Sequence, residues 1–297
     1  MRRILLTGKN GQVGFELQRS LAPLGELIAL DVEDLDLASS EAIRAKVREI
    51  KPQIIVNTAA YTAVDRAESE PDVAMKVNGI APGILAEEAK RLGALMIHYS
   101  TDYVFDGTKS EPYTETDAPN PLSIYGRSKL AGDEAIQATG VSHYIFRTSW
   151  VYAARGQNFL RTMLRLGRER TELRIVDDQI GAPTWATFLA NITAQVLGQV
   201  SGDSDRAREK GGLYNLTASG ATSWYGFAKA IFAEAKNLIP AIEVPKLIPI
   251  STADYPLPAR RPANSRLGTY KFTSAFGLKP PSWETMLKEC VSELGSR

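Results

Sequence analysis

The sequence predicts an α/β fold built on a doubly wound parallel sheet. In the first half of the 297 residues, short apolar runs alternate with longer segments of helical composition. A glycine-rich turn also follows the first apolar run. This alternation is typical of a parallel sheet with helices on both faces. The chain is long enough for one large or two moderate domains.

The first predicted element is a strand over residues 3–7, followed by a turn and a helix that ends near residue 22. Glycine stands at positions 8, 11 and 14 of the turn. Glycines let the backbone approach a pyrophosphate, which then binds at the amino end of the next helix. The alternative is a tight turn without a ligand, since the spacing differs from the usual G-x-G-x-x-G. We assign cofactor binding to Gly8, Asn10, Gly11, Gln12, Val13 and Gly14.

A second strand over residues 26–30 ends at Asp31, seventeen positions after Gly14. A carboxylate at this place accepts hydrogen bonds from the adenosine ribose hydroxyls. It favours NADH over NADPH, because it repels a 2′-phosphate. Lys9 and Arg66 offset that repulsion, so both NADH and NADPH are expected cofactors.

Two further stretches complete the predicted cofactor site. Asp36 and Leu37 lie in the loop after the second strand, where they either flank the adenine or form an exposed acidic turn. After a helix over 41–49, a buried strand over 53–57 leads into small residues, which let a cofactor ribose or phosphate lie against the backbone. These residues are Ala59 and Ala60, followed by Tyr61.

The remaining elements first continue this alternation and then lose it. A long helix over 72–92 and strands over 94–99 and 141–147 complete a Rossmann-like sheet, whose ligands bind beyond the carboxyl ends of its strands. We expect helices over 157–168, 185–197, 223–236 and 282–293, a surface loop over 201–212 and a proline-stiffened segment over 253–268. The predicted domains are a dinucleotide-binding domain over 1–150 and a smaller α/β substrate domain over 151–297, from which some segments return to the first.

Tyr125 and Lys129 stand four residues apart in a segment of helical composition, so a helix places them on one face, one turn apart. The cation favours the phenolate and lowers the pKa of the tyrosine toward working pH, as a general acid or base requires. Ser100 and Thr101 follow the preceding strand and offer hydroxyls to a substrate oxygen beside Tyr125. The alternative is an exposed helical pair with ordinary pKa values, since both residue types are common.

Composition excludes several classes of protein. A net charge of +1 predicts neither a nucleic-acid nor a membrane-surface protein. The two basic clusters, over 165–170 and 206–210, alternate with acids or lie among Ser, Gly and Asp, as in a solvated face or a flexible loop. One cysteine excludes an intramolecular disulfide and a Cys-cluster metal site, and no run approaches the ~18 apolar residues of a membrane span. We therefore expect a cytoplasmic protein without a nucleic-acid or membrane partner. His98 lies in an apolar strand, where we interpret it as a core histidine with a backbone partner.

The chain resembles the extended short-chain dehydrogenase/reductases, from the glycine turn over 7–14 to Tyr125-x-x-x-Lys129. More narrowly, it is similar along nearly its whole length to the dTDP-4-dehydrorhamnose reductase family. The strings that carry this resemblance span residues 8–14, 61–68, 100–107, 146–152, 178–184 and 259–267. The resemblance implies NAD(P)H-dependent reduction of the C4 ketone of a dTDP-bound deoxyhexulose. The implied product is dTDP-L-rhamnose, for cell-surface polysaccharide such as lipopolysaccharide.

The resemblance also implies roles for single residues. Tyr125 protonates the C4 oxygen as hydride arrives, and Lys129 lowers the pKa of Tyr125 and holds the nicotinamide ribose. Thr101 hydrogen-bonds the carbonyl oxygen, and Trp150 packs on the sugar. Ser100 joins the cofactor site. The remaining substrate contacts come from Asp102, Tyr103, Asn264 and the loop with Arg260 and Arg261.

One departure from the family concerns metal binding. Some members are described as pairing through a metal ion held by glutamates. Glu16 is present here, but residues 184–187 contain no acid, which counts against a metal-bridged dimer. We expect no metal site, and a monomer or a weak homodimer.

Other functions on the same fold stay as alternatives. Sugar dehydratases place an Asp-Glu pair after the active-site threonine, where this chain has Asp102-Tyr103. Epimerases need a further acid and base, often Cys and His, and the one cysteine is Cys290. A reductase or epimerase of another nucleotide-activated keto-sugar is one alternative, and a non-catalytic, nucleotide-binding regulatory subunit is the other. The intact set of Thr101, Tyr125 and Lys129 favours an enzyme.

Overall fold

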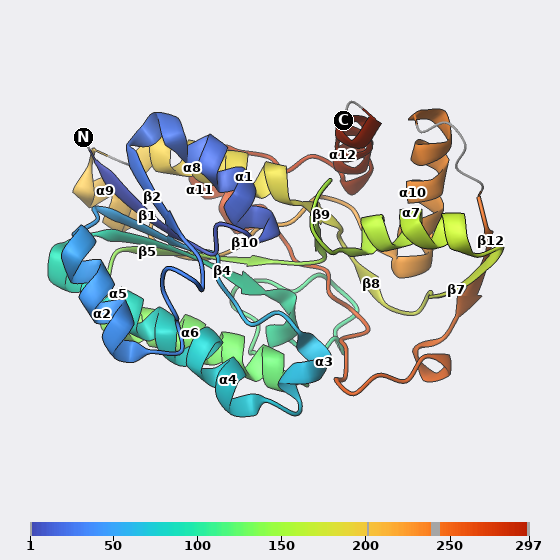
Figure 1. Ribbon diagram of the computed structural model, residues 1–297, viewed down its shortest axis with the longest axis horizontal. Helices are drawn as coiled ribbons and strands as arrows, with labels where there is room; N and C mark the ends of the chain where they lie inside the picture. The colour runs from blue at the N-terminus through green and yellow to red at the C-terminus, as the bar shows by residue number, and fades with distance from the viewer. Residues whose placement is uncertain (1, 201, 239–243, 296–297) are drawn as a thin grey trace.

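The computed structural model describes residues 2–200, 202–238 and 244–295, and its centre is a parallel sheet of six strands (Figure 1). In spatial order the strands are β10 (Gly212–Asn215), β5 (His143–Thr148), β4 (Leu95–Thr101), β3 (Ile54–Asn57), β1 (Arg3–Thr7) and β2 (Glu26–Leu30). Every neighbouring pair is parallel. The chain winds outward from β1 in both directions, so the switch point lies between β1 and β3. The predicted doubly wound sheet is confirmed.

Helices cover both faces of the sheet (Figure 1), because successive residues of a strand point to opposite faces. One layer consists of α2 (Ser40–Ile50), α5 (Ala81–Leu92) and α6 (Ile124–Thr139). The other consists of α1 (Gln12–Leu21), α8 (Ala186–Val200) and α11 (Tyr270–Phe276). Leu5 and Met96 belong to the first core, and their neighbours Leu6 and Ile97 to the second. None of the helices in the described ranges is long and apolar enough to cross a membrane.

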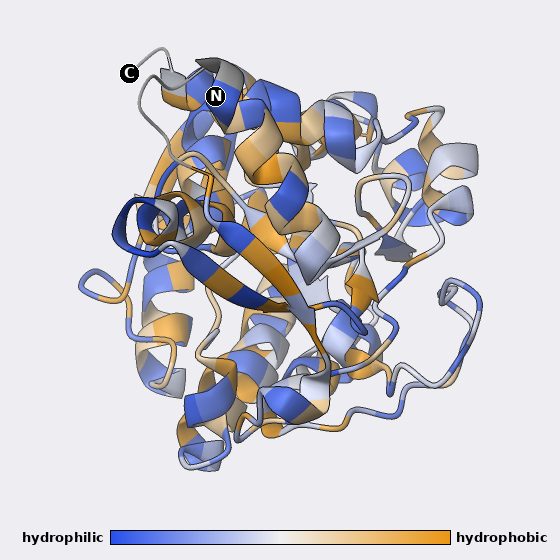
Figure 2. Ribbon diagram, turned by 90° about the vertical axis from the view of Figure 1, so that its right-hand side faces the viewer, coloured by the Kyte–Doolittle hydropathy of each residue, from blue (hydrophilic) through white to orange (hydrophobic). Residues whose placement is uncertain are grey.

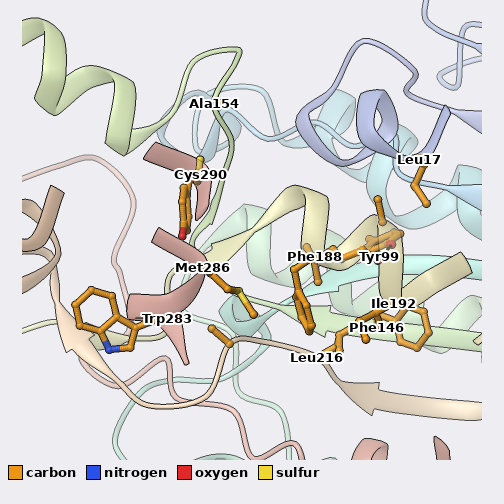
Figure 3. Packing of buried hydrophobic residues seen from close by; sticks show 14 of the residues in the cluster. Leu17, Tyr99, Phe146, Ala154, Phe188, Ile192, Leu216, Trp283, Met286 and Cys290 are labelled. Atoms are coloured by element: carbon orange, nitrogen blue, oxygen red, sulfur yellow. Dashed lines mark hydrogen bonds between the residues drawn. The ribbon is translucent and has the colours of Figure 1, made fainter. Parts of the chain in front are cut away.

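Beyond β5 the chain adds a second region. Figure 2 shows the molecule with the right-hand side of Figure 1, where this region lies, facing the viewer. Its helices are α7 (Phe159–Glu169), α10 (Trp224–Leu238) and α12 (Trp283–Gly295). Its strands pair in twos: β7 (Glu172–Val176) with β12 (Lys246–Ile250), β6 (Val151–Tyr152) with β9 (Thr184–Trp185), and β8 (Ile180–Gly181) with β11 (Thr222–Ser223). Figure 3 shows the apolar cluster running from Leu17 through Phe188 to Met286 and Trp283. The second region therefore shares a core with the sheet.

The predicted long helix over 72–92 is interrupted. It consists of α4 (Pro71–Met75), a π-helical turn (Lys76–Ile80) and α5. The side chain of Asn78 accepts a hydrogen bond from the N–H of Tyr61 (2.8 Å) and donates one to its carbonyl oxygen (3.0 Å). The wider turn thus lets Asn78 hold the loop after β3, at the edge of the site described below.

The segment over 201–212 differs from the predicted loop, apart from residue 201, which lies outside the described residues. It contains α9 (Ser204–Glu209), and β10 begins at Gly212. Asp203 caps this helix by accepting hydrogen bonds from two backbone N–H groups. The polar composition of this segment resembles that of a loop, so the short capped helix is not predicted from the sequence. Shorter helical turns cover Ala22–Leu24, Val64–Ala67, Asp102–Val104 and Thr252–Asp254.

Candidate active site

A cavity of about 900 Å³ opens at the carboxyl ends of the strands, where doubly wound sheets bind their ligands. It brings together residues that lie far apart in the sequence. The predicted cofactor residues all line it: Gly8, Asn10, Gly11, Gln12, Val13, Gly14, Asp31, Asp36, Leu37, Ala59, Ala60, Tyr61, Ser100, Tyr125 and Lys129. Four predicted substrate residues also line it: Thr101, Asp102, Tyr103 and Trp150.

The glycine turn forms a cradle that side chains would fill. Gly8 has a φ of +78°, and a Cβ there would lie 2.8 Å from the backbone of Ala59. A Cβ on Gly14 would lie 1.9 Å from the carbonyl oxygen of Gly8. Helix α1 begins at Gln12, and no described side chain caps it by a hydrogen bond. Its first N–H groups and the positive end of its dipole suit a pyrophosphate.

The acidic end of the cavity lies beside Asp31, at the end of β2. Two cations are expected from the sequence to offset its charge. Lys9 forms an ion pair with Asp34, and Arg66 pairs with Glu70 at 2.7 Å. Both cations are therefore engaged by other carboxylates, which weakens their offset of Asp31.

Helix α6 sets the spacing of Tyr125 and Lys129. Ser123 caps the helix by accepting a hydrogen bond from the N–H of Gly126 (3.1 Å). Gly126 allows close packing after β4, since a Cβ there would lie 2.2 Å from the carbonyl oxygen of Tyr103. The rings of Tyr125 and Tyr103 meet edge to face with centroids 5.5 Å apart. Both predicted catalytic side chains thus line the cavity from successive turns of one helix.

Burial controls the pKa values of this pair. It raises the pKa of Tyr125 to about 12, although a hydrogen bond with Thr101 acts in the opposite direction. It lowers the pKa of Lys129 to about 8, while the charge of Asp133 raises it. The prediction that Lys129 brings the pKa of Tyr125 below its ordinary value is therefore wrong, because desolvation disfavours the phenolate more strongly. The raised pKa keeps Tyr125 protonated, which is the form of a general acid.

Thr101 and Asp102 follow one another beside Tyr125. The Thr101 hydroxyl donates to Oδ1 of Asp102 (3.2 Å) and accepts from the N–H of Tyr103 (3.2 Å). Asp102 is buried, and burial raises its pKa to about 6 against the effect of a hydrogen bond with Ser265. Its Oδ2 atom has no hydrogen-bond partner among the described residues. Asp102 thus holds a buried acceptor without a described partner beside Thr101.

Trp150 is held in an unusual conformation. Its φ is +47°, in the left-handed region that few non-glycine residues adopt. Its ring stacks on Trp224 with centroids 3.6 Å apart, and a Cβ on Gly181 would lie 2.5 Å from the same ring. Trp224 also lines the cavity, and its indole N–H donates to Gln179 (3.2 Å). Trp224 is not predicted from the sequence, because it begins a helix more than seventy residues after Trp150 and no local spacing links the two.

Two predicted substrate residues do not line this cavity. Asn264 is buried, and its side-chain N–H groups donate to two carbonyl oxygens of the loop over 109–111 (2.7 and 2.9 Å). Arg260 is exposed, whereas Arg261 forms two hydrogen bonds with the carboxylate of Asp65 (2.8 and 3.1 Å). The amide of Asn264 therefore joins two loops, and contact of Asn264 or Arg260 with a substrate stays a prediction.

His98 is joined to the catalytic pair through its side chain. Its Nε2 atom lies 3.1 Å from Nζ of Lys129. Its Nδ1 atom lies 3.0 Å from the side-chain nitrogen of Asn57. His98 is buried in the core as predicted, but its ring contacts two side chains, so the predicted backbone partner is wrong.

The chain matches known proteins along its whole length. Residues 1–296 match the family model described as RmlD substrate binding domain. The chain is 50% identical over 297 residues to the dTDP-4-dehydrorhamnose reductase of Burkholderia thailandensis, with 99% of this chain and 100% of that protein covered. The chain belongs to the dTDP-4-dehydrorhamnose reductase family. The resemblance drawn from the sequence strings is confirmed.

Solved structures of the dTDP-4-dehydrorhamnose reductase family have the same fold. The enzyme of Clostridium acetobutylicum is 40% identical with a TM-score of 0.90, covering 98% of this chain and 99% of that one. The enzyme of Bacillus anthracis, solved in complex with NADP, is 37% identical with a TM-score of 0.89, covering 99% and 100%. Both cover the sheet and the second region, so the whole architecture is that of the family.

Two places in the chain bear on metal binding, namely Glu16 and residues 184–187. Glu16 is buried, and the guanidinium of Arg19 lies 3.6 Å from its carboxylate. Thr187 is buried in α8, within the stretch that contains no acid. No group of three or more His, Cys, Asp and Glu side chains suited to a metal occurs in the described part of the chain.

Proposed function

We propose that this chain uses NADPH or NADH to reduce the C4 ketone of dTDP-4-dehydro-L-rhamnose to dTDP-L-rhamnose, for cell-surface polysaccharide synthesis. The observation that carries the proposal is the cavity that joins the glycine turn to Thr101, Tyr125 and Lys129. Relatives named dTDP-4-dehydrorhamnose reductase that share half of the sequence support it.

The lining of the cavity fits a dinucleotide. The glycine turn and the amino end of α1 suit its pyrophosphate, and Asp31 suits its adenosine ribose. When bound, the reduced dinucleotide supplies a hydride to C4 of the sugar. The NADP complex of the Bacillus anthracis relative supports use of NADPH. The pairing of Lys9 with Asp34 and of Arg66 with Glu70 supports use of NADH as well, because neither cation is free to offset Asp31.

Tyr125 is the proton donor in this proposal. Burial keeps its phenol protonated, and the neighbouring Thr101 hydroxyl is proposed to hydrogen-bond the same ketone oxygen. The proton passes from Tyr125 to that oxygen as C4 receives its hydride, which completes the alcohol. Lys129, charged below a pH of about 8, stabilises the phenolate that remains.

The sugar nucleotide is proposed to lie between the regions over 1–150 and 151–297. The stacked rings of Trp150 and Trp224 offer an apolar wall to the carbon face of a deoxysugar. Asp102 and Tyr103 supply polar groups to the same cavity. We also propose that the protein is a cytoplasmic monomer or weak homodimer. The balanced charge of +1 suggests that it acts without nucleic acid or membrane.

The test is the loss of absorbance at 340 nm from NADPH, and separately from NADH, with dTDP-4-keto-6-deoxy-L-hexulose made in situ by its upstream enzymes. Oxidation that needs both the protein and the sugar nucleotide is expected, and its rate ranks the two dinucleotides. Dinucleotide binding without oxidation would point instead to a regulatory subunit or to another keto-sugar.

A further inference from the structure

A row of buried polar side chains crosses the sheet beneath Lys129. Thr7, Asn57 and His98 are partners in register on β1, β3 and β4. In-register residues of neighbouring strands point to the same face, which here is the face covered by α6. The Thr7 hydroxyl lies 2.6 Å from Oδ1 of Asn57, and the row continues through His98 to Lys129. All four side chains are at most 2% exposed.

This row fixes part of the hydrogen bonding of Lys129. A lysine ammonium has three N–H donors on a flexible stem. One donates to the carbonyl oxygen of Tyr99 (2.6 Å), and a second faces Nε2 of His98 (3.1 Å). The third is left for the cavity that Lys129 lines. Two contacts from β4 therefore decide where the ammonium lies.

We propose that His98 is a positioning residue for Lys129. Together with Asn57 and Thr7, it holds the ammonium beside Tyr125 and stabilises the charged form of the lysine. Its effect on turnover rests on the proposed function. Its effect on the protonation of Lys129 does not, and can be measured without any substrate.

The hydrogen-bonding capacity of the row supports this role. Burial and the charge of Lys129 lower the pKa of His98 well below its ordinary value, so its ring is neutral and only one nitrogen carries a proton. With Nδ2 of Asn57 donating to Nδ1, the proton lies on Nε2 and is donated to an uncharged Lys129. With the amide turned, Oδ1 accepts from Nδ1, and Nε2 accepts from the ammonium. The ammonium gains an acceptor only in the second arrangement, so that arrangement is the one we propose for the charged lysine.

The other charged groups around Lys129 define the sign of the effect. Asp133 on α6 and Arg147 on β5 form a buried pair at 3.2 Å, and the charge of Asp133 raises the pKa of Lys129. Both remain when His98 is replaced. Loss of the neutral acceptor disfavours the ammonium, so the pKa of Lys129 is expected to fall.

The direct test is a pH titration of Lys129 by NMR, in protein labelled with ¹³Cε-lysine and free of ligands. The Lys129 signal is identified by its absence from Lys129→Met. We expect His98→Leu to lower the titration midpoint by about one pH unit, the effect of one hydrogen bond to a charged group. His98→Gln places an oxygen at the reach of Nε2, so its midpoint returns toward that of the natural chain.

The matched control is Thr193→Val. Thr193 is equally buried and hydrogen-bonds the Tyr99 hydroxyl from α8, on the opposite face of the sheet. We expect Thr193→Val to lower the free energy of unfolding without moving the titration midpoint of Lys129. An unchanged midpoint in His98→Leu, or equal midpoints in His98→Leu and His98→Gln, would overturn the proposal. If His98→Leu does not fold, Asn57→Ala is expected to give a smaller downward shift, and an unmoved midpoint there contradicts the proposal equally.

Turnover links the titration to the reaction. A midpoint lower by one unit leaves His98→Leu about fivefold less active than the natural chain at pH 8 and nearly equal at pH 6. A purely structural loss would lower the rate at both pH values. Absence of turnover in the natural chain, with the NMR shift present, would contradict the proposed function and leave the role of His98 standing.

Discussion

Tyr125 occupies a place where burial and hydrogen bonding act in opposite directions. Its surroundings raise the pKa of the phenol to about 12, and Thr101 opposes this by hydrogen bonding. A reductase needs the proton on the phenol before the ketone is reduced, so the raised pKa serves the forward reaction. Lys129 then matters most after transfer, when its charge stabilises the phenolate.

Tyr125→Phe should lower turnover by ~10²-fold or more, the scale of general-acid catalysis, and leave dinucleotide affinity nearly unchanged. The reason is that the change removes the proton and keeps the ring beside Tyr103. Turnover is measured at 340 nm and affinity by dinucleotide fluorescence. Tyr144→Phe is the control, since the buried Tyr144 hydroxyl bonds only backbone among described contacts, at Ala207 (2.9 Å), away from the cavity lining. Near-normal turnover in Tyr125→Phe would remove Tyr125 from its role.

Trp224→Ala should raise KM for the sugar nucleotide by about three- to tenfold, the worth of one aromatic contact. The change removes one ring of the apolar wall. It also frees the ring of Trp150, whose centroid lies 3.6 Å from that of Trp224 in the natural chain. KM for the dinucleotide is expected to stay constant, and Trp224→Phe to keep most of the affinity. Steady-state kinetics with each substrate varied decides the matter, and an equal rise in both KM values would argue for general disruption.

Residue-scale prediction from sequence succeeds where the signal is local. Tyr125 and Lys129 are found because four residues make about one helical turn. The pKa values of these two side chains are not predicted, because the burial that determines them comes from distant segments. Asn264 shows the same limit: its place in a conspicuous string suggests substrate, while its amide is engaged by the loop over 109–111.

Among the elements, the turn from β1 into α1 has the least tolerance for change. Gly14→Ala should reduce dinucleotide affinity by at least about tenfold, because its Cβ would lie 1.9 Å from the carbonyl oxygen of Gly8 and deform the cradle. Gly198→Ala is the matched control, since a Cβ there meets nothing within 4 Å and Gly198 lies within helix α8. Equal affinity of both variants, measured by dinucleotide fluorescence, would show that the cradle does not hold the cofactor.

Strands of the first half are predictable at the scale of elements because each is a short apolar run bounded by polar residues. β1 and β2 have the predicted bounds. The π-helical turn is not predictable, because it depends on Asn78 meeting Tyr61, seventeen residues earlier. Neither are β7 and β12, which pair across seventy residues and have no continuous apolar pattern.

In the whole molecule, the sheet and the second region share one apolar core that reaches from Leu17 to Trp283 (Figure 3). We therefore expect a single cooperative unfolding transition, although two domains are predicted from the sequence. Differential scanning calorimetry is the measurement, and bound NADPH should raise the transition temperature by stabilising the folded state alone. Two separate transitions would show that the regions over 1–150 and 151–297 unfold independently.

The return of β10 to the edge of the sheet is a whole-molecule feature that local patterns do not reveal. It pairs with β5 from a segment more than sixty residues later. Returning segments are expected from the sequence, but β10 is not predicted, since its four residues are too few for a periodic signal. The match to the family model covers residues 1–296 and so includes β10, which the spacing of residues does not identify.

Transfer of deuterium from 4-deuterated NADPH tests the central claim most directly. The protein is incubated with the labelled dinucleotide and the dTDP-4-keto-6-deoxy-L-hexulose, and the sugar nucleotide is analysed by NMR and mass spectrometry. We expect one deuterium at C4 of dTDP-L-rhamnose when the transferred hydrogen is the labelled one, and none from the opposite epimer. Label at another carbon, or an unlabelled product with both epimers, would contradict hydride transfer to C4 in this cavity.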